Sequence, residues 1–304
     1  MKRRTFINSG LTAGFLMAIP GGSFATDEVN INKNNGLPDL VGVINGTATE
    51  MFEKGIKELG GMGSFVKKGQ IVVVKPNIGW NVTKDLGANT DPDLVGAIIK
   101  SAYASGAKKV YVFDNTCNNW KSCYKNSGIE EAVLKNGGFM MPGNHEENYK
   151  AVKIPGAKYL KDVKVHELYL DADVIINVPT LKHHGGARMT SAIKNLMGVV
   201  WDRRMWHKLD LQQCIGEFPL IRKPDLNIVD AYTVMMKNGP RGISKADVAL
   251  KKMQILSRDM VAADSASAAI MEFESSYIPY IGIAAKLGLG IEDLSKLSIK
   301  RISL

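Results

Sequence analysis

Short apolar runs alternate along the chain with longer segments in which apolar residues recur at helical spacing. Runs rich in β-branched residues predict strands, and a spacing of three to four residues predicts helices. The predicted strands are Leu40–Ile44, Ile71–Val74, Lys109–Phe113, Val174–Val178, Leu226–Val229 and Met253–Leu256. The predicted helices are Thr49–Leu59, Thr90–Gly106, Gly128–Lys135, Ala187–Met197, Asp259–Phe273 and Ile281–Leu287. This alternation indicates an α/β fold, with a mainly parallel open sheet and helices on both faces.

The pattern weakens between Gly137 and Lys164, where glycine, proline and asparagine are scattered. We interpret the region around 137–170 as a small irregular β excursion, with Val163–Leu168 as one of its strands. Apolar residues make up 45% of the chain and charged residues 23%, which are ordinary values for a globular protein. Residues 38–304 are therefore expected to form a single α/β domain.

The first 25 residues have the order of a twin-arginine signal peptide. The start MKRRTFIN is followed by an apolar stretch over 10–20 and by SFA before Thr26, which favours cleavage after Ala25. The apolar stretch is too short to span a bilayer, which takes about 20 residues. Residues 26–37 are polar and indicate a linker. We therefore predict a protein exported by the twin-arginine machinery, periplasmic or otherwise outside the cytoplasm, with no stable membrane insertion after cleavage.

The net charge is moderately positive, at +9 for the whole chain. Loss of Lys2, Arg3 and Arg4 with the signal peptide would leave +6. No basic run of five residues is present, and aromatic residues do not interleave with the cations as in single-strand binders. The charge therefore favours a small anionic ligand, and nucleic acid is not expected as a partner.

The three cysteines are Cys117, Cys123 and Cys214. In an exported protein a Cys117–Cys123 disulfide is one alternative, and free thiols are the other. The chain has no Cys-x-x-Cys motif, so an iron–sulfur cluster held by this chain alone is not expected.

The segment 177–208 concentrates positive charge directly after a predicted strand. It contains three of the five histidines and, from Lys182 onward, a single acid, Asp202. Its permanent cations are Lys182, Arg188, Lys194, Arg203, Arg204 and Lys208. A strand end that leads through glycines into such a segment is where an open α/β sheet usually binds its ligand. The excess of cations indicates a carboxylate or a phosphate as that ligand.

Polar side chains follow four of the predicted strands. They come from Lys75–Asn77, Asp114–Thr116, Lys182–His184 and Asp230–Tyr232. In a parallel sheet the carboxyl ends of the strands share one edge, so we expect these four groups to meet in a common cleft.

Roles for the candidate residues follow from their chemistry. Acid/base groups expected in the cleft are His183, His184, His207 and Lys182. Groups expected to bind the substrate are Lys75, Asn77, Thr190, Lys194, Asn195 and Arg203. Asp114 and Asp230 would either hold a divalent metal together with a histidine or orient that histidine. Adjacent residues of an extended chain point to opposite sides, so only one of His183 and His184 can face the ligand.

Three further readings remain open at this point. Thr190 and Lys194 would lie one turn apart on the predicted helix, although Lys194 alone would more often be a surface lysine. The loop 238–242 is either a lid over the cleft or a plain turn. Asp259 is explained by helix capping, whereas Asp264 lies inside an alanine-rich helix and needs a partner.

With these residues in view, the chain resembles the domain of unknown function 362 family. The matching pieces are VVVKPNIG (72–79), VPTLKHH (178–184), T-x-x-x-K-N-L-M-G (190–198), Arg203 with His207, LNIVDAY (226–232), NGPRG (238–242) and the Asp259/Asp264 helix. Some members of this family carry cysteine-rich, ferredoxin-like segments. This chain lacks them, so the resemblance implies the positions of the site residues and does not imply redox chemistry.

The leading hypothesis is an exported enzyme that acts on a small anionic substrate by acid/base chemistry, with metal assistance left open. A non-catalytic periplasmic protein that binds a carboxylate or phosphate is the first alternative. An accessory protein for the maturation of another exported complex is the second.

Overall fold

A computed structural model of the chain describes residues 36–304. The signal peptide predicted over 1–25 and all but the last two residues of the linker predicted over 26–37 lie outside the described residues. The described structure begins with β1 and is built around a ten-stranded mixed sheet in which most strand pairs are parallel. Within residues 36–304 no helix is long and apolar enough to cross a membrane.

The main sheet has the strand order β12-β1-β11-β10-β7-β2-β3-β4, with β8 and β9 attached to β10. Its strands are β1 (Leu40–Ile44), β2 (Ile71–Pro76), β3 (Lys109–Val112), β4 (Phe139–Met140), β7 (Val174–Val178), β8 (Thr180–His184), β9 (Arg188–Thr190), β10 (Leu226–Met235), β11 (Val248–Ser257) and β12 (Ile299–Ser303). The pairs β1–β11, β10–β11 and β8–β9 are antiparallel, and the other pairs are parallel. The predicted α/β class with a mainly parallel sheet is therefore confirmed.

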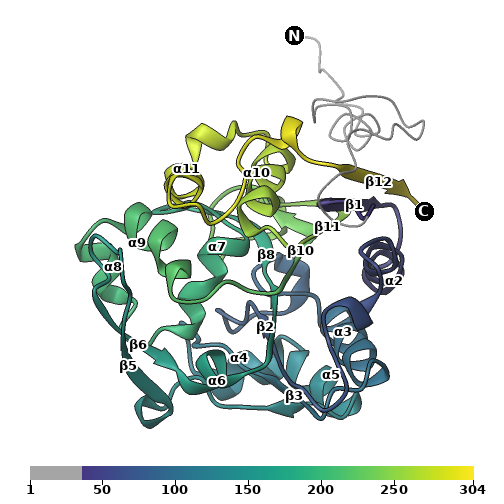
Figure 1. Cartoon of the computed structure of the whole chain (residues 1–304), viewed down its shortest axis with the longest axis horizontal. Helices are drawn as coiled ribbons and strands as arrows, with labels where there is room; N and C mark the ends of the chain where they lie inside the picture. The colour runs from purple at the N-terminus through teal and green to yellow at the C-terminus, as the bar shows by residue number, and fades with distance from the viewer. Residues whose placement is uncertain (1–35) are drawn as a thin grey trace.

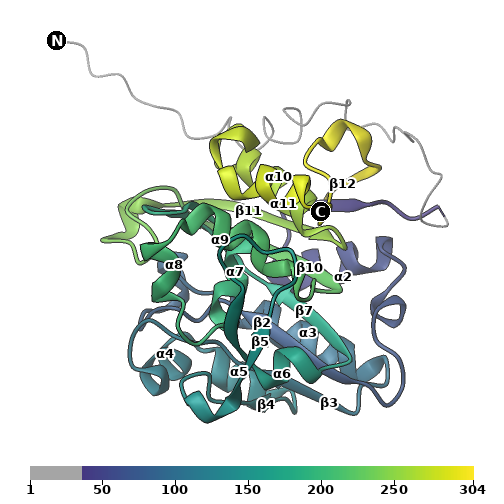
Figure 2. The same ribbon diagram turned by 60° about the vertical axis from the view of Figure 1, so that its left-hand side comes forward.

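Helices cover both faces of this sheet, as Figures 1 and 2 show. They are α2 (Ala48–Glu58), α3 (Pro92–Ala104), α4 (Trp120–Asn126), α5 (Ile129–Lys135), α6 (Glu167–Asp171), α7 (Ala192–Asn195), α8 (Arg204–Lys208), α9 (Leu211–Glu217), α10 (Met260–Ile270) and α11 (Pro279–Lys286). In Figure 1 the helices α2, α3 and α5 lie to the right, and α7, α9, α10 and α11 lie toward the upper left.

Two hydrophobic cores result, one on each face of the sheet. On β2, Val72 and Val74 pack into the core that contains α2, α3 and α5. Val73, which lies between them, packs into the core that contains α7, α9, α10 and α11. This alternation explains why β2 is a continuous apolar run: both sides of the strand are buried.

Residues 137–170 are more regular than the sequence suggests. β4 joins the edge of the main sheet, where it pairs parallel with β3. β5 (Tyr149–Lys153) and β6 (Asp162–His166) form a separate antiparallel hairpin. The buried carboxylate of Glu217 fixes the loop of this hairpin, because it accepts hydrogen bonds from the backbone N–H groups of 158, 159 and 160.

Two predicted elements differ from the structure in ways that affect the site. The helix expected over Ala187–Met197 is a β8–β9 hairpin followed by the short α7, because 182–184 pair antiparallel with 188–190 across a Gly185–Gly186 turn. The strand expected to end at Val229 runs on to Met235, so Asp230 lies inside β10 and not in a loop after it.

Candidate functional site

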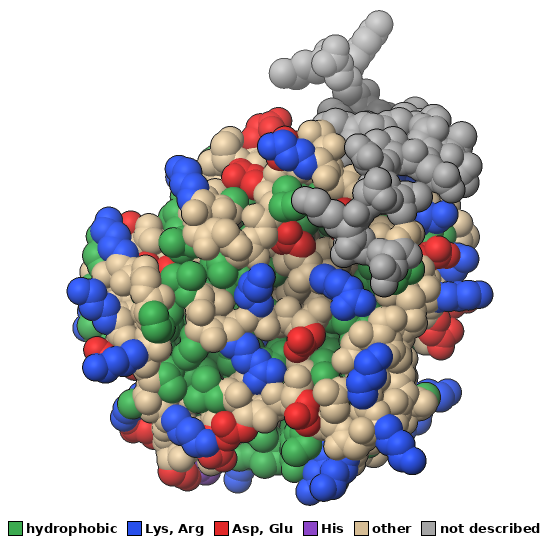
Figure 3. All heavy atoms as spheres, viewed as in Figure 1, with side chains coloured by type: hydrophobic (Ala, Val, Ile, Leu, Met, Phe, Trp, Pro, Cys, Tyr) green, Lys and Arg blue, Asp and Glu red, His purple; other side chains and the backbone are tan. Residues whose placement is uncertain are grey.

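A cavity of about 1120 Å³ opens at the carboxyl end of β2 and β3. Its polar wall comes from β2, from the loop after β3, from the β8–β9 hairpin and from α7. The polar residues that line this wall are Lys75, Asn77, Asp114, Thr116, Cys117, Lys182, His184, Thr190, Lys194 and Asn195. The rest of the cavity lining comes from the β5–β6 hairpin and from the segment 200–209. These add mainly apolar and aromatic side chains, such as Leu160 and Trp201. In the space-filling view an apolar area left of centre is bordered by Lys and Arg side chains (Figure 3).

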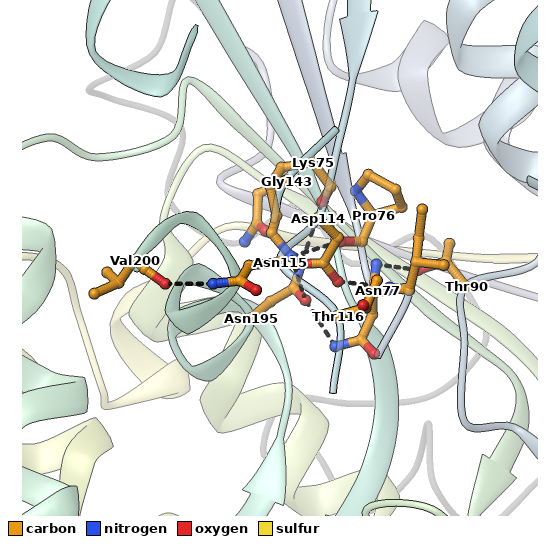
Figure 4. Close-up of polar contacts among 12 residues, drawn as sticks. Lys75, Pro76, Asn77, Thr90, Asp114, Asn115, Thr116, Gly143, Asn195 and Val200 are labelled. Carbon is orange, nitrogen blue, oxygen red and sulfur yellow. Dashed lines mark hydrogen bonds and ion pairs between the residues drawn. The ribbon is translucent and has the colours of Figure 1, made fainter. Parts of the chain in front are cut away.

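A buried ion pair lies at the base of the cavity. Lys75 is fully buried, and its Nζ lies 2.8 Å from Oδ1 of Asp114. The same ammonium group donates to the carbonyl of Pro76 at 2.6 Å and to Oδ1 of Asn195 at 3.2 Å. Oδ2 of Asp114 accepts the backbone N–H of Ile78 at 2.6 Å, so both oxygens of this carboxylate are engaged (Figure 4). Burial lowers the pKa of Lys75, and the carboxylate of Asp114 opposes that shift.

Asparagine side chains connect this ion pair to Lys182. Nδ2 of Asn77 donates to Oδ1 of Asn195 at 2.9 Å, and Oδ1 of Asn77 accepts from Nζ of Lys182 at 3.0 Å. Lys182 also donates to the carbonyl of Ala88 and is only 1% exposed. Nδ2 of Asn195 donates to Oδ1 of Asn177 at 2.8 Å, and Asn177 is not among the site residues expected from the sequence. The only feature of the sequence that indicates a role for Asn177 is its position as a polar residue inside an apolar strand.

Lys182 and Lys194 differ from Lys75 because neither has a carboxylate partner among residues 36–304. Burial, with smaller contributions from Lys194 and Lys75, lowers the pKa of Lys182 to about 7. Burial, together with Arg203 and Lys75, lowers the pKa of Lys194 to about 8. The cavity therefore concentrates positive charge that the described part of the chain does not neutralise.

The two adjacent histidines point to different surroundings, as the sequence predicts. His184 lines the cavity, and its Nδ1 accepts the backbone N–H of Ala187 at 3.0 Å. Nδ1 of His183 accepts the backbone N–H of Gly239 at 3.1 Å, and His183 does not line the cavity. Burial and the nearby lysines lower the pKa of His184 to about 2. A neutral imidazole whose Nδ1 is an acceptor carries its proton on Nε2, so His184 is suited to donate a hydrogen bond to a ligand.

Residues 203–207 form part of the cavity wall. The guanidinium of Arg203 donates to the carbonyls of Asn115 and Thr116 and, at 3.2 Å, to Sγ of Cys117. It holds the loop after β3 in place, so its donors are largely engaged. His207 also lines the cavity, and burial followed by Lys194 and Arg203 lowers its pKa.

The structure brings most of the predicted site residues together, with two exceptions. His183 faces the loop 238–242, of which Pro240 lines the cavity. Asp230 lines a second cavity of about 610 Å³, where its oxygens accept the backbone N–H groups of Asp91 and Tyr232. Desolvation raises the pKa of Asp230 to about 7.

The metal hypothesis that joined Asp114 to Asp230 does not fit this arrangement. The two carboxylates line different cavities. Val229 and Ala231, on either side of Asp230 in β10, both pack into the core that contains α7 and α10, so the side chain of Asp230 points to the opposite face of the sheet. Within residues 36–304, no three or more His, Cys, Asp or Glu side chains lie close enough to hold a metal ion. All three cysteines fall in this range and are free thiols, with Cys117 exposed and Cys123 buried.

Two residues support the site from outside the polar wall. Thr90 accepts the backbone N–H of Asn77 at 2.8 Å and donates to the carbonyl of Val178 at 2.7 Å, whereas the N-cap of α3 is Asp91. Asp264 accepts the backbone N–H groups of Ala192 and Ile193 at the start of α7, which answers the question of its partner. Neither pairing could be read from the sequence, because each joins segments far apart in the chain.

Comparison with known proteins gives a family for most of the chain. The model of a family described as Domain of unknown function (DUF362) matches residues 72–269. A thylakoid-associated protein of Synechocystis sp. is 28% identical over 248 residues, which cover 77% of this chain and 73% of that protein. A probable 6-phospho-beta-glucosidase of Bacillus subtilis is 30% identical over 107 residues, which cover 34% of this chain and 24% of that protein.

Two solved structures show distant similarity. The lactate racemase apoprotein from Thermoanaerobacterium thermosaccharolyticum aligns with a TM-score of 0.45 at 10% identity, over 72% of this chain and 54% of that one. A protein from Thermotoga maritima aligns with a TM-score of 0.44 at 15% identity, over 75% of this chain and 59% of that one. The chain thus spans little more than half the length of either structure.

Proposed function

Since the chain belongs to the DUF362 family, whose domain is described as one of unknown function, we propose a function from the properties of the cavity. The protein is an exported enzyme that binds a small carboxylate or phosphate and acts on it by acid/base chemistry. One observation carries the proposal. Lys182 and Lys194 line one cavity without a carboxylate partner in the described part of the chain. Lys182 is buried and Lys194 partly buried. Cations that are removed from water without an anionic partner are costly, and an anion that enters the cavity would supply the missing charge.

The neutral groups of the cavity fit the same ligand. Thr190 is 2% exposed, and its hydroxyl has no hydrogen-bond partner within residues 36–304. It lies directly across the hairpin from Lys182, since the two residues are register partners of β9 and β8. A hydroxyl, an ammonium group and the Nε2–H of His184 around one space form a set of donors suited to an oxyanion.

The roles of the acid/base groups follow from their surroundings. His184 would donate a hydrogen bond to the substrate and stay neutral. Lys182 would exchange protons with the substrate, because a group whose pKa lies near 7 does so most efficiently at neutral pH. The more exposed His207 is the second candidate for proton exchange. Export by the twin-arginine pathway is part of the proposal and rests on the sequence 1–25.

Calorimetric titration with phosphate, sulfate and pyruvate tests the proposal. We expect binding of at least one of these anions, and we expect Lys182→Met to weaken it about tenfold or more, since one charge-assisted hydrogen bond contributes roughly 1.5–3 kcal/mol. Lys153→Met is the matched control, because Lys153 is exposed and does not line the cavity. Absence of binding by all three anions, or equal affinity in Lys182→Met and Lys153→Met, would contradict the proposal.

A non-catalytic binding protein would use the same cations. The chemical fate of the ligand distinguishes the two functions. An enzyme is expected to alter its substrate chemically, whereas a binding protein returns its ligand unchanged after prolonged incubation, as NMR of the recovered ligand would reveal.

A further inference from the structure

Four lysines line the cavity, and their surroundings differ. Lys164, on the β5–β6 hairpin, is ion-paired with Glu146. Lys75 forms an ion pair with Asp114, with its Nζ 2.8 Å from Oδ1. Lys182 is held by Oδ1 of Asn77 and by a backbone carbonyl. The Nζ of Lys194, on α7, makes no hydrogen bond and no ion pair with any residue of the described chain. Its amino group is therefore the one whose lone pair and N–H bonds are both available to a ligand.

The backbone that carries Lys194 is fixed, although its amino group is not. The side chain of Asp264 accepts the N–H groups of Ala192 and Ile193, so the first turn of α7 is capped from α10. The next residue, Asn195, is anchored by Asn177 at 2.8 Å. Lys194 thus presents an amino group without a protein partner, on a fixed backbone inside a cavity. A nucleophile requires this arrangement.

The cavity already contains groups that suit the two ends of a 2-oxo acid. Lys182 and the unpartnered hydroxyl of Thr190 are suited to the carboxylate, as argued above. The carbonyl group next to that carboxylate would then lie within the same cavity as Lys194. Burial and the neighbouring cations also keep part of Lys194 in the free-amine form at neutral pH, since its pKa is lowered to about 8.

We propose that Lys194 forms a Schiff base with the carbonyl carbon of a 2-oxo carboxylate bound in this cavity. The inference rests on the proposed anion-binding function and names its substrate class.

The step balances without an oxidant or a reductant. The lone pair of Nζ attacks the carbonyl carbon, the carbon–oxygen π pair moves to the oxygen, and that oxygen takes up a proton. The resulting carbinolamine accepts a second proton on its hydroxyl, loses water and forms the C=N bond. Each proton that the oxygen takes up comes from the ammonium of Lys182, and each proton that the nitrogen loses restores that ammonium, so the net products are the imine and one water. The neutral His184 donates a hydrogen bond to the oxygen through Nε2–H and keeps its proton. Loss of water leaves an imine, which can be protonated and then withdraws electrons from the substrate carbon.

Trapping by borohydride tests this directly on the full chain. Incubation with pyruvate or phenylpyruvate followed by borohydride reduces a C=N bond to a stable secondary amine. We expect the wild-type protein to gain one such group, located by peptide mass spectrometry on Lys194. Lys194→Arg keeps the positive charge and is not a nucleophile, so it should lose trapping while it still binds pyruvate in calorimetry. Lys153→Arg, at an exposed site, should be trapped like the wild type.

The outcomes separate this inference from the proposed function. If either 2-oxo acid binds but no adduct forms, or if the adduct forms on another lysine, the Schiff base is refuted and anion binding stands. If phosphate, sulfate and both 2-oxo acids all fail to bind, the proposed function fails and the inference fails with it. An adduct on Lys194 that Lys194→Arg abolishes supports both.

Discussion

Gly198 is the residue at which the smallest change in sequence should disturb the site most. It follows α7 and lines the cavity, and its carbonyl accepts the backbone N–H of Asn115 at 2.9 Å. A Cβ added here would lie 1.9 Å from Oδ1 of Asp114 and 2.5 Å from Nζ of Lys75. Both distances are below any real contact, and both atoms belong to the buried ion pair. The substitution Gly198→Ala therefore forces the two charges apart or displaces the backbone.

The magnitude follows from the burial of that pair. Lys75 is 0% and Asp114 2% exposed, so neither charge can turn to solvent when the contact is lost. Breaking a buried pair typically costs about 3–5 kcal/mol. Lys75 would keep its hydrogen bonds to Pro76 and Asn195, so we expect the lower end, about 3 kcal/mol. For a domain of this size that corresponds to a fall in Tm of about 6 °C or more.

Denaturant unfolding and calorimetric titration with sulfate measure the two consequences. Gly63→Ala is the matched control, because Gly63 is exposed and an added Cβ meets nothing within 4 Å. The control should stay within about 0.5 kcal/mol of the wild type. If Gly198→Ala is as stable as Gly63→Ala and binds sulfate equally well, the packing of Gly198 against the ion pair has no energetic importance and the reasoning is wrong.

Two further predictions follow from the same site. The lowered pKa values of Lys182 and Lys194, about 7 and about 8, mean that both amines lose their charge as the pH rises through this range. Sulfate affinity should therefore fall between pH 6 and 9, by up to about tenfold per pH unit for each proton taken up on binding. An affinity that calorimetry finds unchanged over that range would contradict this prediction. Asp264→Ala removes the acceptor of two backbone N–H groups at the start of α7. We expect denaturant unfolding to show that the free energy of unfolding falls by about 1–3 kcal/mol, and by less for Asp264→Asn. Equal stability of both variants and the wild type would show that this cap is dispensable.

Local patterns were sufficient for most of the framework. β1 and β7 were predicted with their bounds and β2 to within two residues, because a strand buried on both faces is a continuous apolar run. β3, in which exposed or partly exposed positions alternate with buried ones, was predicted to within one residue. The cap of α10 was also predictable, since the side chain of Asp259 accepts the N–H groups of Val261 and Ala262, three residues away at most. The convergence of Lys75, Asp114 and His184 on one cavity followed from the geometry of parallel strands.

The chain's own alternation of apolar runs and helical spacings thus determined the fold class and the edge of the sheet at which the cavity lies. Tertiary structure alone decided that Thr190 pairs with Lys182 across a hairpin, that Asp264 caps α7, and that Asp230 lies in another cavity. The apolar residues of 187–197 satisfy helical spacing, yet antiparallel pairing of 182–184 with 188–190 forms instead, and no local preference encodes that partner. Local patterns record how one segment buries its own side chains, whereas hydrogen bonds between distant segments depend on which surfaces the folded chain brings together.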